Sequence, residues 1–216
     1  MSGSKKAKLF TFKYFFYDFM RVTGALPGVI WLRPKIRYAS KAAKKRIRGG
    51  ALVISNHTSF VDPAFTMFVI WYRRQFFVCH EAFLKTKAGP FFRAAGCLIP
   101  IDAENFNINS FRVITESMKN GKVVTLFPEG HVNGEGGDMT EFKSGMVLLS
   151  MQSKRPVVPI FMKPREHWYS RLKAVIGEPV DVAAMCADGP AFKKIKEATE
   201  LLRQREEQLE EIARNL

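Results

Sequence analysis

Apolar and polar positions along this chain form short blocks that predict alternating strands and helices. Brief apolar runs bounded by glycine, proline or polar residues are typical of buried strands, and they occupy 51–55, 75–80, 97–102, 122–130, 156–162 and 171–180. Apolar residues at helical spacing fill the segments 81–96, 107–121, 143–154 and 191–215. The alternation predicts an α/β protein, a layered fold with a mainly parallel central sheet flanked by helices.

The N-terminal segment carries a different apolar pattern. Aromatic residues at positions 12, 15, 16 and 19 recur at helical spacing, and a further apolar piece over 24–32 is broken by Pro27 and Gly28. Charged residues interrupt the run, so it falls short of the roughly 20 apolar residues that a spanning helix needs. No small-residue cleavage site follows it, which argues against a signal peptide. We therefore predict an amphipathic helical segment that lies in a membrane interface.

The charge distribution supports this interpretation of the N-terminus. The net charge of the chain is +14, and residues 1–50 hold 13 Lys and Arg against one acidic residue, Asp18. A local basic region indicates an anionic partner. We expect an anionic membrane surface and no nucleic acid, because the aromatic residues form an apolar face instead of alternating with basic ones. The alternative, a first helix that only packs on the core, stays open.

Length and composition fit one globular α/β domain with an appendage. The chain has 216 residues, of which 47% are hydrophobic and 25% charged. We assign 1–48 to the membrane-associating segment and 49–216, with the C-terminal helix, to the α/β domain. The three cysteines make an odd number without a C-x-x-C pair, so we expect a reducing compartment and no disulfide framework. The expected location is the cytoplasmic face of a membrane, with peripheral or monotopic attachment.

The stretch NHTSFVD, residues 56–62, places chemically active side chains directly after the first predicted strand. His57 and Asp62 are five positions apart, whereas neighbours on one helical face are three or four apart. If a helix capped by Thr58 or Ser59 begins after the turn, the imidazole and the carboxylate meet across that turn. The spacing therefore predicts a catalytic pair.

A carboxylate occupies the corresponding place after a later strand. FPEG, residues 127–130, sets Glu129 between a proline and a glycine directly after apolar residues. In an open α/β sheet, ligands bind beyond the carboxyl ends of the strands. We therefore expect Glu129 to lie at the same rim as His57 and Asp62, although Glu129 taken alone would be an ordinary turn residue.

Together these stretches resemble the glycerolipid acyltransferases of the 1-acylglycerol-3-phosphate acyltransferase family, of bacterial type. NHTSFVD is similar to the family's His-x-x-x-x-Asp motif, GCLIPID (96–102) to its second block, FPEG to its third and VVPIFM (157–162) to its fourth. The blocks come in the family's order. The resemblance implies transfer of a fatty acyl chain from acyl-CoA or acyl-ACP to the free hydroxyl of 1-acylglycerol-3-phosphate (lysophosphatidic acid). The product would be phosphatidic acid, in phospholipid biosynthesis.

The resemblance also implies roles for individual residues. His57 would be the general base that deprotonates the acceptor hydroxyl, and Asp62 would orient its ring and stabilise the imidazolium. Backbone N–H groups at the start of the following helix would receive the thioester oxyanion. Asn56, Glu129 and Gly130 would belong to the substrate-binding site. No cofactor and no metal are expected, because the acyl donor and the lysolipid acceptor are both substrates.

Two departures from the family pattern concern the acceptor. The second block is usually followed by arginine, which is Ala103 here, and the third usually reads Glu-Gly-Thr-Arg, where Val132 holds the last position. Both arginines are associated in the family with the acceptor's phosphate, for which an arginine fork is the natural partner. A lysophospholipid with a diester head group, or an aminoacyl lipid, therefore stays open as the acceptor. We expect one of Arg93, Arg112, Lys143 and His131 to substitute for the missing arginines, but the sequence does not determine which, and an ordinary turn residue is the alternative interpretation of His131.

A metal-dependent hydrolase is the main rival outside acyl transfer. Its ligands would come from His57, Asp62, His80, Glu81 and His131. The sequence has no His-x-x-x-His pair, and residues 80–81 read as a strand end that meets a helix start. Acyl transfer is therefore the favoured interpretation.

Overall fold

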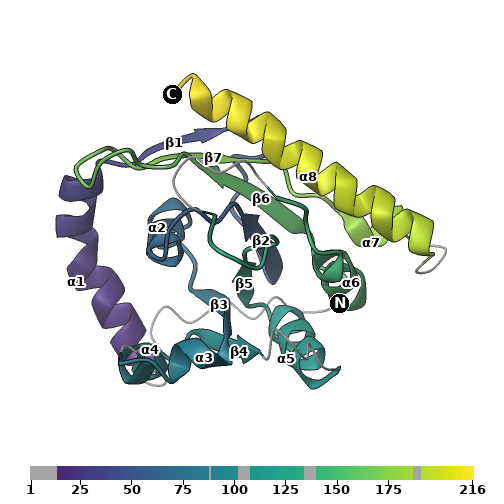
Figure 1. Cartoon of the computed structure of the whole chain (residues 1–216), viewed down its shortest axis with the longest axis horizontal. Coiled ribbons are helices and arrows are strands. Elements are labelled where there is room, and N and C mark those ends of the chain that lie inside the picture. Colours follow the sequence, from purple (N-terminus) through teal and green to yellow (C-terminus); the bar gives the residue numbers. More distant parts are fainter. Residues whose placement is uncertain (1–13, 88, 102–107, 134–139, 187–190) are drawn as a thin grey trace.

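The computed structural model describes residues 14–87, 89–101, 108–133, 140–186 and 191–216. In these parts of the chain a seven-stranded sheet has the order β1-β7-β6-β2-β5-β3-β4 (Figure 1). The strands are β1 (Lys35–Tyr38), β2 (Ala51–Ser55), β3 (Gln75–His80), β4 (Leu98–Ile101), β5 (Val123–Leu126), β6 (Val157–Met162) and β7 (Lys173–Ile176). The helices are α1 (Phe15–Leu32), α2 (Asp62–Val69), α3 (Glu81–Leu84), α4 (Gly89–Ala95), α5 (Ile108–Lys119), α6 (Gly145–Ser153), α7 (Val182–Met185) and α8 (Phe192–Arg214).

The sheet is mainly parallel, as the sequence predicted. Strands β2 to β6 all run in one direction, whereas β7 is antiparallel to β6, and β1 is parallel to β7. The carboxyl ends of β2 to β6 therefore lie together, and we call this the carboxyl end of the sheet. Because β1 runs the opposite way, its first residue, and with it the last turn of α1, also lies at the carboxyl end.

Helices cover both faces of the sheet, which explains the unbroken apolar runs. On β2, Leu52 and Ile54 pack in a cluster with residues of α5, α6 and α8, whereas Ala51 and Val53 pack in a cluster with residues of α1 and α2. All four side chains are fully buried. A strand whose two faces are both buried needs apolar residues at every position rather than at alternate ones.

Helix α1 is continuous, so the predicted break at Pro27 and Gly28 is wrong. It is a single helix of 18 residues with Pro27 inside it. Gly28 allows α1 and α2 to approach closely, because a Cβ at this position would lie 2.2 Å from an atom of the Phe68 ring. Proline removes only one N–H from the helical ladder, and packing of α1 on the body compensates for that loss.

The inner face of α1 packs on the domain. The hydroxyl of Tyr17 accepts the N–H of Gln75 at 3.3 Å, at the start of β3. The buried carboxylate of Asp18 accepts two hydrogen bonds from the guanidinium of Arg74. The strand β1 also lies within residues 1–48, so part of this segment belongs to the central sheet. The helix is therefore fixed to the body along its inner side and runs from the amino end of β3 to the carboxyl end of the sheet.

The outer face of α1 is apolar and exposed. Its side chains recur every three or four residues and are between 50 and 71% exposed; they are Phe15, Phe19, Val22, Leu26 and Ile30. We call these five residues the α1 stripe. No helix in the described ranges is both long and apolar enough to cross a membrane. The first 13 residues, with part of the predicted basic segment, lie outside the described residues.

Candidate active site

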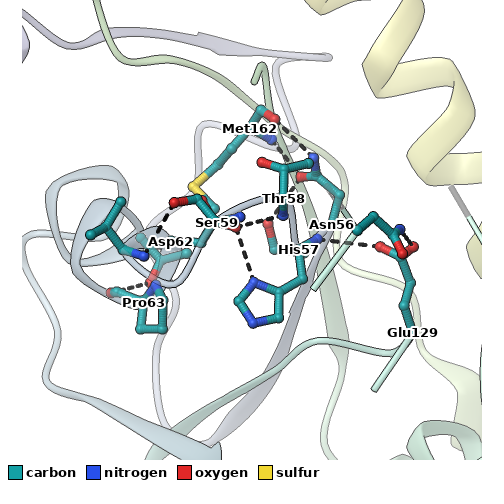
Figure 2. A network of polar contacts seen from close by, with 12 residues as sticks. Asn56, His57, Thr58, Ser59, Asp62, Pro63, Glu129 and Met162 are labelled. Carbon is teal, nitrogen blue, oxygen red and sulfur yellow. Dashed lines mark hydrogen bonds and ion pairs between the residues drawn. The ribbon is translucent and has the colours of Figure 1, made fainter. Parts of the chain in front are cut away.

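The turn between β2 and α2 is closed by the side chain of Asp62 (Figure 2). Helix α2 begins at Asp62, and no side chain caps it, so the predicted cap by Thr58 or Ser59 is wrong. The backbone N–H groups of Thr58 and Ser59 donate to Asp62 Oδ2 at 2.7 and 2.8 Å instead. The carboxylate at the helix start therefore holds the turn that precedes it.

The same carboxylate oxygen binds the imidazole of His57. Nδ1 of His57 lies 3.0 Å from Asp62 Oδ2, and the Asp62 side chain is buried. Because this oxygen accepts hydrogen bonds from two amides, we assign Nδ1 as the donor to it, and in the neutral ring Nε2 then carries the lone pair. The imidazole stacks on Phe127 of the neighbouring strand end, with ring centroids 4.0 Å apart. The two residues predicted as a pair are thus in contact, with the ring in the orientation that a general base needs.

Most backbone N–H groups around the start of α2 already have partners in the protein, so few of the predicted oxyanion donors remain. The N–H groups of Thr58 and Ser59 are occupied by the Asp62 carboxylate. The N–H of Asp62 donates to the Ser59 carbonyl at 3.1 Å, and Pro63 has no N–H. The Thr58 and Ser59 amides therefore stabilise the His57–Asp62 pair, and the N–H of Ala64 in the first turn of α2 remains the candidate oxyanion donor.

Asn56 connects the ends of β2 and β6. Its side-chain amide donates to the Met162 carbonyl at 2.9 Å, and its oxygen accepts the Met162 N–H at 2.8 Å. This pair of bonds extends the β2–β6 ladder by one step beyond the last paired residues, Ser55 and Ile160. Both ends of the buried amide are used on the backbone, so Asn56 positions the residue that follows it, His57.

Glu129 lies at the predicted rim, and its carboxylate joins the His57 turn to the loop after β5. Oε1 accepts the His57 N–H at 3.3 Å. Oε2 accepts the backbone N–H of Thr140 at 2.9 Å, the Thr140 hydroxyl at 3.0 Å and the side-chain amide of Asn133. Asn133 also donates its backbone N–H to the His57 carbonyl at 2.8 Å. A buried carboxylate with four donors stabilises the site by positioning both segments.

Asn133 and Thr140 are functional candidates that the sequence pattern did not indicate. They lie four and eleven positions after Glu129, on a polar loop without regular spacing. A buried carboxylate such as that of Glu129 needs several hydrogen-bond donors, but nothing in the loop sequence showed which residues would supply them.

Gly130 and Lys143 lie against each other beside Glu129. Gly130 has a φ of 76°, a left-handed conformation that favours glycine, and a Cβ there would lie 2.7 Å from Lys143 Nζ. The Lys143 side chain is exposed and forms no ion pair with any described residue. Among the residues that the structure describes, no carboxylate therefore neutralises this ammonium group, which lies next to the third sequence block.

Of the other predicted cations, Arg93 lies away from this turn and His131 lies within it. Arg93 is exposed in the last turn of α4, between β3 and β4, and its guanidinium donates to the Leu84 carbonyl at 3.4 Å. Its described contacts include none with the His57 turn. His131 is exposed, and its Nδ1 bonds the Glu129 carbonyl at 3.0 Å. Ala103 lies outside the described residues.

The histidines and carboxylates considered for a metal hydrolase do not form one cluster. His80 accepts the N–H of Ala82 at 3.0 Å and caps α3. Within the described ranges, no group of three or more His, Cys, Asp and Glu side chains is arranged to hold a metal ion. The geometry at His57 is that of a base with an orienting carboxylate.

A second buried carboxyl group lies near Glu129. Glu206 of α8 is fully buried, and neither of its carboxyl oxygens has a hydrogen-bond partner among the described residues. Burial, and then the negative charge of Glu129, raise the pKa of Glu206 well above its ordinary value. Glu206 is therefore favoured as a neutral acid in the folded protein.

A family model described as Acyltransferase matches residues 32–163, well over half of the chain. This range begins at the end of α1 and includes the His57 turn, Glu129 and β6.

Two named relatives are similar in sequence. The 1-acyl-sn-glycerol-3-phosphate acyltransferase of Bacillus subtilis (strain 168) is 26% identical over 173 residues, which cover 74% of this chain and 81% of that protein. A protein of the same name from Limnanthes alba is 35% identical over 152 residues, which cover 62% of this chain and 47% of the relative.

One solved structure is similar in fold. It is the crystal structure of the 1-acyl-sn-glycerophosphate (LPA) acyltransferase, PlsC, from Thermotoga maritima, with a TM-score of 0.64. The match covers 93% of this chain and 80% of that chain at 18% sequence identity. At this identity the likeness concerns the fold.

Proposed function

This chain belongs to the Acyltransferase family and is an O-acyltransferase, and we propose that it acylates the free hydroxyl of 1-acylglycerol-3-phosphate. The acyl donor would be acyl-CoA or acyl-ACP, and the product phosphatidic acid. The observation that carries the proposal is the His57 ring, whose Nδ1 lies 3.0 Å from Asp62 and whose Nε2 is left for a substrate hydroxyl. The names of both sequence relatives support the choice of acceptor.

The proposed reaction uses His57 first as a base and then as an acid. Nε2 takes the proton of the acceptor hydroxyl while the hydroxyl oxygen attacks the thioester carbonyl carbon, forming the new C–O bond. The tetrahedral intermediate then expels the thiolate as the C–S bond breaks. The thiolate takes the proton from the imidazolium, so His57 returns to its neutral form. The Asp62 carboxylate stabilises the imidazolium between these steps, and a base of this kind contributes on the order of 10²–10⁴-fold in rate.

Lys143 is the described cation that best fits the acceptor phosphate. Its ammonium covers Gly130, one residue beyond Glu129, and Glu129 binds the His57 backbone. Lysine binds phosphate as a point charge rather than through a bidentate fork. A single lysine in place of the family's arginines is consistent with a phosphate site that is weaker but lies at the same rim.

The α1 stripe supports peripheral attachment to a membrane. An exposed row of large apolar residues on a helix fixed by its inner face is the arrangement of an interfacial helix. We propose that the stripe lies in the interfacial region of the cytoplasmic leaflet, where a lysolipid acceptor is available from the bilayer and a thioester donor from the aqueous side.

The test of the proposed function is a comparison of initial rates with defined substrates. Purified protein is assayed with lysophosphatidic acid, lysophosphatidylglycerol and lysophosphatidylethanolamine, each with acyl-CoA and with acyl-ACP. We expect the highest kcat/KM for lysophosphatidic acid, and no transfer by a folded His57→Ala variant. A consistent preference for the diester lipids would overturn the acceptor, and wild-type turnover by His57→Ala would overturn the mechanism.

A further inference from the structure

The loop that joins β6 to β7, residues 163–172, is fixed to the C-terminal end of α1. The N–H of Leu172 donates to the Leu32 carbonyl at 2.8 Å, and the Leu172 carbonyl accepts the N–H of Lys35 at 2.8 Å. The loop is therefore bonded to both sides of the junction between α1 and β1. In Figure 1 it lies beside the end of α1 that leads into β1.

This position places the loop at the same end of the sheet as the catalytic pair. The strand β6 ends at Met162, whose backbone is bonded to Asn56, the residue before His57. The guanidinium carbon of Arg165 lies 5.2 Å from the ring centroid of Phe65, one turn into α2 after Asp62. The loop and the His57 turn are therefore neighbours through α2.

Arginine side chains donate hydrogen bonds to the backbone of residues 168–170, which we call the loop tip. The guanidinium of Arg165 donates to the Ser170 carbonyl at 2.8 Å and to the Trp168 carbonyl. Arg33, at the end of α1, donates to the Tyr169 carbonyl at 2.7 Å. Three successive carbonyls thus have partners within the protein. Backbone groups that leave bulk water need such partners, so the tip meets a condition for contact with lipid.

The side chains of the tip are aromatic and exposed. Trp168 is 73% and Tyr169 55% exposed, although the backbone carbonyls of both are hydrogen-bonded within the protein. Trp31, in the last turn of α1, is 46% exposed, and the Arg165 guanidinium lies 4.9 Å from its ring centroid. The aromatic surface of the loop therefore continues the apolar surface of α1. Tryptophan and tyrosine are enriched at the level of lipid headgroups.

The charge beneath these aromatic residues is positive. Arg33, Arg165 and Arg171 gather at the base of the loop, since Arg171 donates to the Arg33 carbonyl at 3.0 Å. In the described part of the chain none of the three forms an ion pair, and the sole acidic residue of the loop sequence is the exposed Glu166. Burial, and then the charge of Arg33, lower the pKa of the Arg165 guanidinium. Such a group is stabilised by an external anion.

We propose that the β6–β7 loop is a second membrane contact, with Trp168 and Tyr169 at the headgroup level of an anionic bilayer and the three arginines at lipid phosphates. The proposal rests on the membrane attachment proposed for α1 and extends it, because two contacts determine an orientation. The carboxyl end of the sheet faces the bilayer, and Phe60, 83% exposed in the His57 turn, lies at that end. A lipid acceptor then reaches His57 from the membrane side.

Tryptophan fluorescence of two full-length variants tests the contact directly. One variant keeps Trp168 and carries Trp31→Phe and Trp71→Phe. The matched control replaces all three tryptophans by phenylalanine and carries Phe192→Trp, because Phe192 is 85% exposed at the start of α8, across the sheet from α2. Both are mixed with phosphatidylglycerol–phosphatidylcholine vesicles whose acyl chains are brominated. We expect a blue shift and strong quenching for Trp168, and neither for the tryptophan introduced at position 192.

Each outcome decides the proposal. Unquenched Trp168 in a protein that sediments with the vesicles would overturn the loop contact and leave the α1 contact standing. A protein that does not sediment with anionic vesicles would overturn both contacts, but acyl transfer measured in detergent solution would be unaffected by that result. Equal quenching of the two variants would show contact without orientation and would also overturn the proposal.

Substitution of the aromatic pair provides an independent measurement. We expect Trp168→Ser with Tyr169→Ser to lower partitioning onto anionic vesicles by about tenfold, and Phe192→Ser to leave it unchanged. Thermal melts establish that each variant is folded. If the double variant partitions onto vesicles as the wild type does, the membrane contact is contradicted. The exposed aromatic pair would then have another role, such as contact with a protein.

Discussion

A single oxygen of Asp62 binds both the ring of His57 and the backbone of the turn that carries His57. The distance from Asp62 Oδ2 to His57 Nδ1 is 3.0 Å, and the same oxygen accepts the N–H groups of Thr58 and Ser59 at 2.7 and 2.8 Å. The carboxylate therefore has an electrostatic role toward the imidazole and a structural role toward the turn. These two roles can be separated by substitution.

Asp62→Asn should keep the turn and lose the electrostatic role. The amide oxygen of asparagine accepts the same backbone N–H groups, but it carries no charge to stabilise the imidazolium. We expect kcat to fall by about 10²–10⁴-fold with little change in melting temperature, whereas Asp62→Ala should lower both. Steady-state kinetics and thermal melts measure the two effects. An Asp62→Asn variant with near-normal kcat would contradict the proposed role of the charge.

Lys143→Ala should raise KM for lysophosphatidic acid more than it lowers kcat. The ammonium lies beside Gly130, and in the proposed acceptor site it would interact with the phosphate in the ground state and the transition state alike. We expect KM to rise by about tenfold, with recovery in Lys143→Arg. Arg93→Ala is the matched control, because Arg93 bonds Leu84 in the α3–α4 region. If Arg93→Ala but not Lys143→Ala selectively lost activity toward lysophosphatidic acid, the phosphate site would have to be assigned to α4.

Serine substitutions on the α1 stripe should release the protein from membranes without unfolding it. Deletion of 1–32 would also remove Asp18 from Arg74 and expose buried residues, so substitutions on the outer face are the cleaner test. We expect Phe19→Ser, Leu26→Ser and Ile30→Ser together to lower vesicle binding by about a hundredfold or more. Activity on bilayer lipid should fall more than activity on a short-chain soluble acceptor. The control is Ile108→Ser on α5, and unchanged flotation of the triple variant would place the membrane contact elsewhere.

Glu206→Gln should stabilise the protein at high pH. Burial and the charge of Glu129 raise the pKa of Glu206 above its value in the unfolded chain, so the folded protein binds more protons between these two pKa values. The wild type therefore loses stability as pH rises through this window, and the glutamine variant does not. We expect the free energy of unfolding of the variant to exceed that of the wild type by about 1–3 kcal/mol at pH 8, and the difference to shrink toward pH 4.5.

Urea denaturation over this pH range measures the Glu206 effect. The matched control is Glu207→Gln, because Glu207 is exposed on the same helix and pairs with Arg203 at the surface, where an ion pair contributes little. A difference between Glu206→Gln and wild type that does not change with pH would contradict the buried neutral acid.

Local patterns in the sequence determined the layered fold and the pairing of His57 with Asp62. A strand buried on both faces, such as 51–55, must be apolar throughout, and helices repeat their apolar positions with a period of 3.6 residues. Such elements are readable from their own residues, whereas the edge strand β1 and the short helix α7 were not predicted. His57 and Asp62 lie within one turn of chain, so their contact needs only a strand that stops and a helix that starts.

Tertiary structure decided what depends on residues far apart in the sequence. The Glu129 carboxylate accepts hydrogen bonds from Asn133 and Thr140, which lie four and eleven positions further along the chain. The Thr58 and Ser59 N–H groups bond Asp62. Helix α1 continues through Pro27 because Gly28 allows contact with Phe68, and the β6–β7 loop reaches α1 because β1 runs against β2. These contacts depend on the order in which the strands pair. Strand order depends on how the whole sheet packs, so it cannot be predicted from any single segment of the sequence.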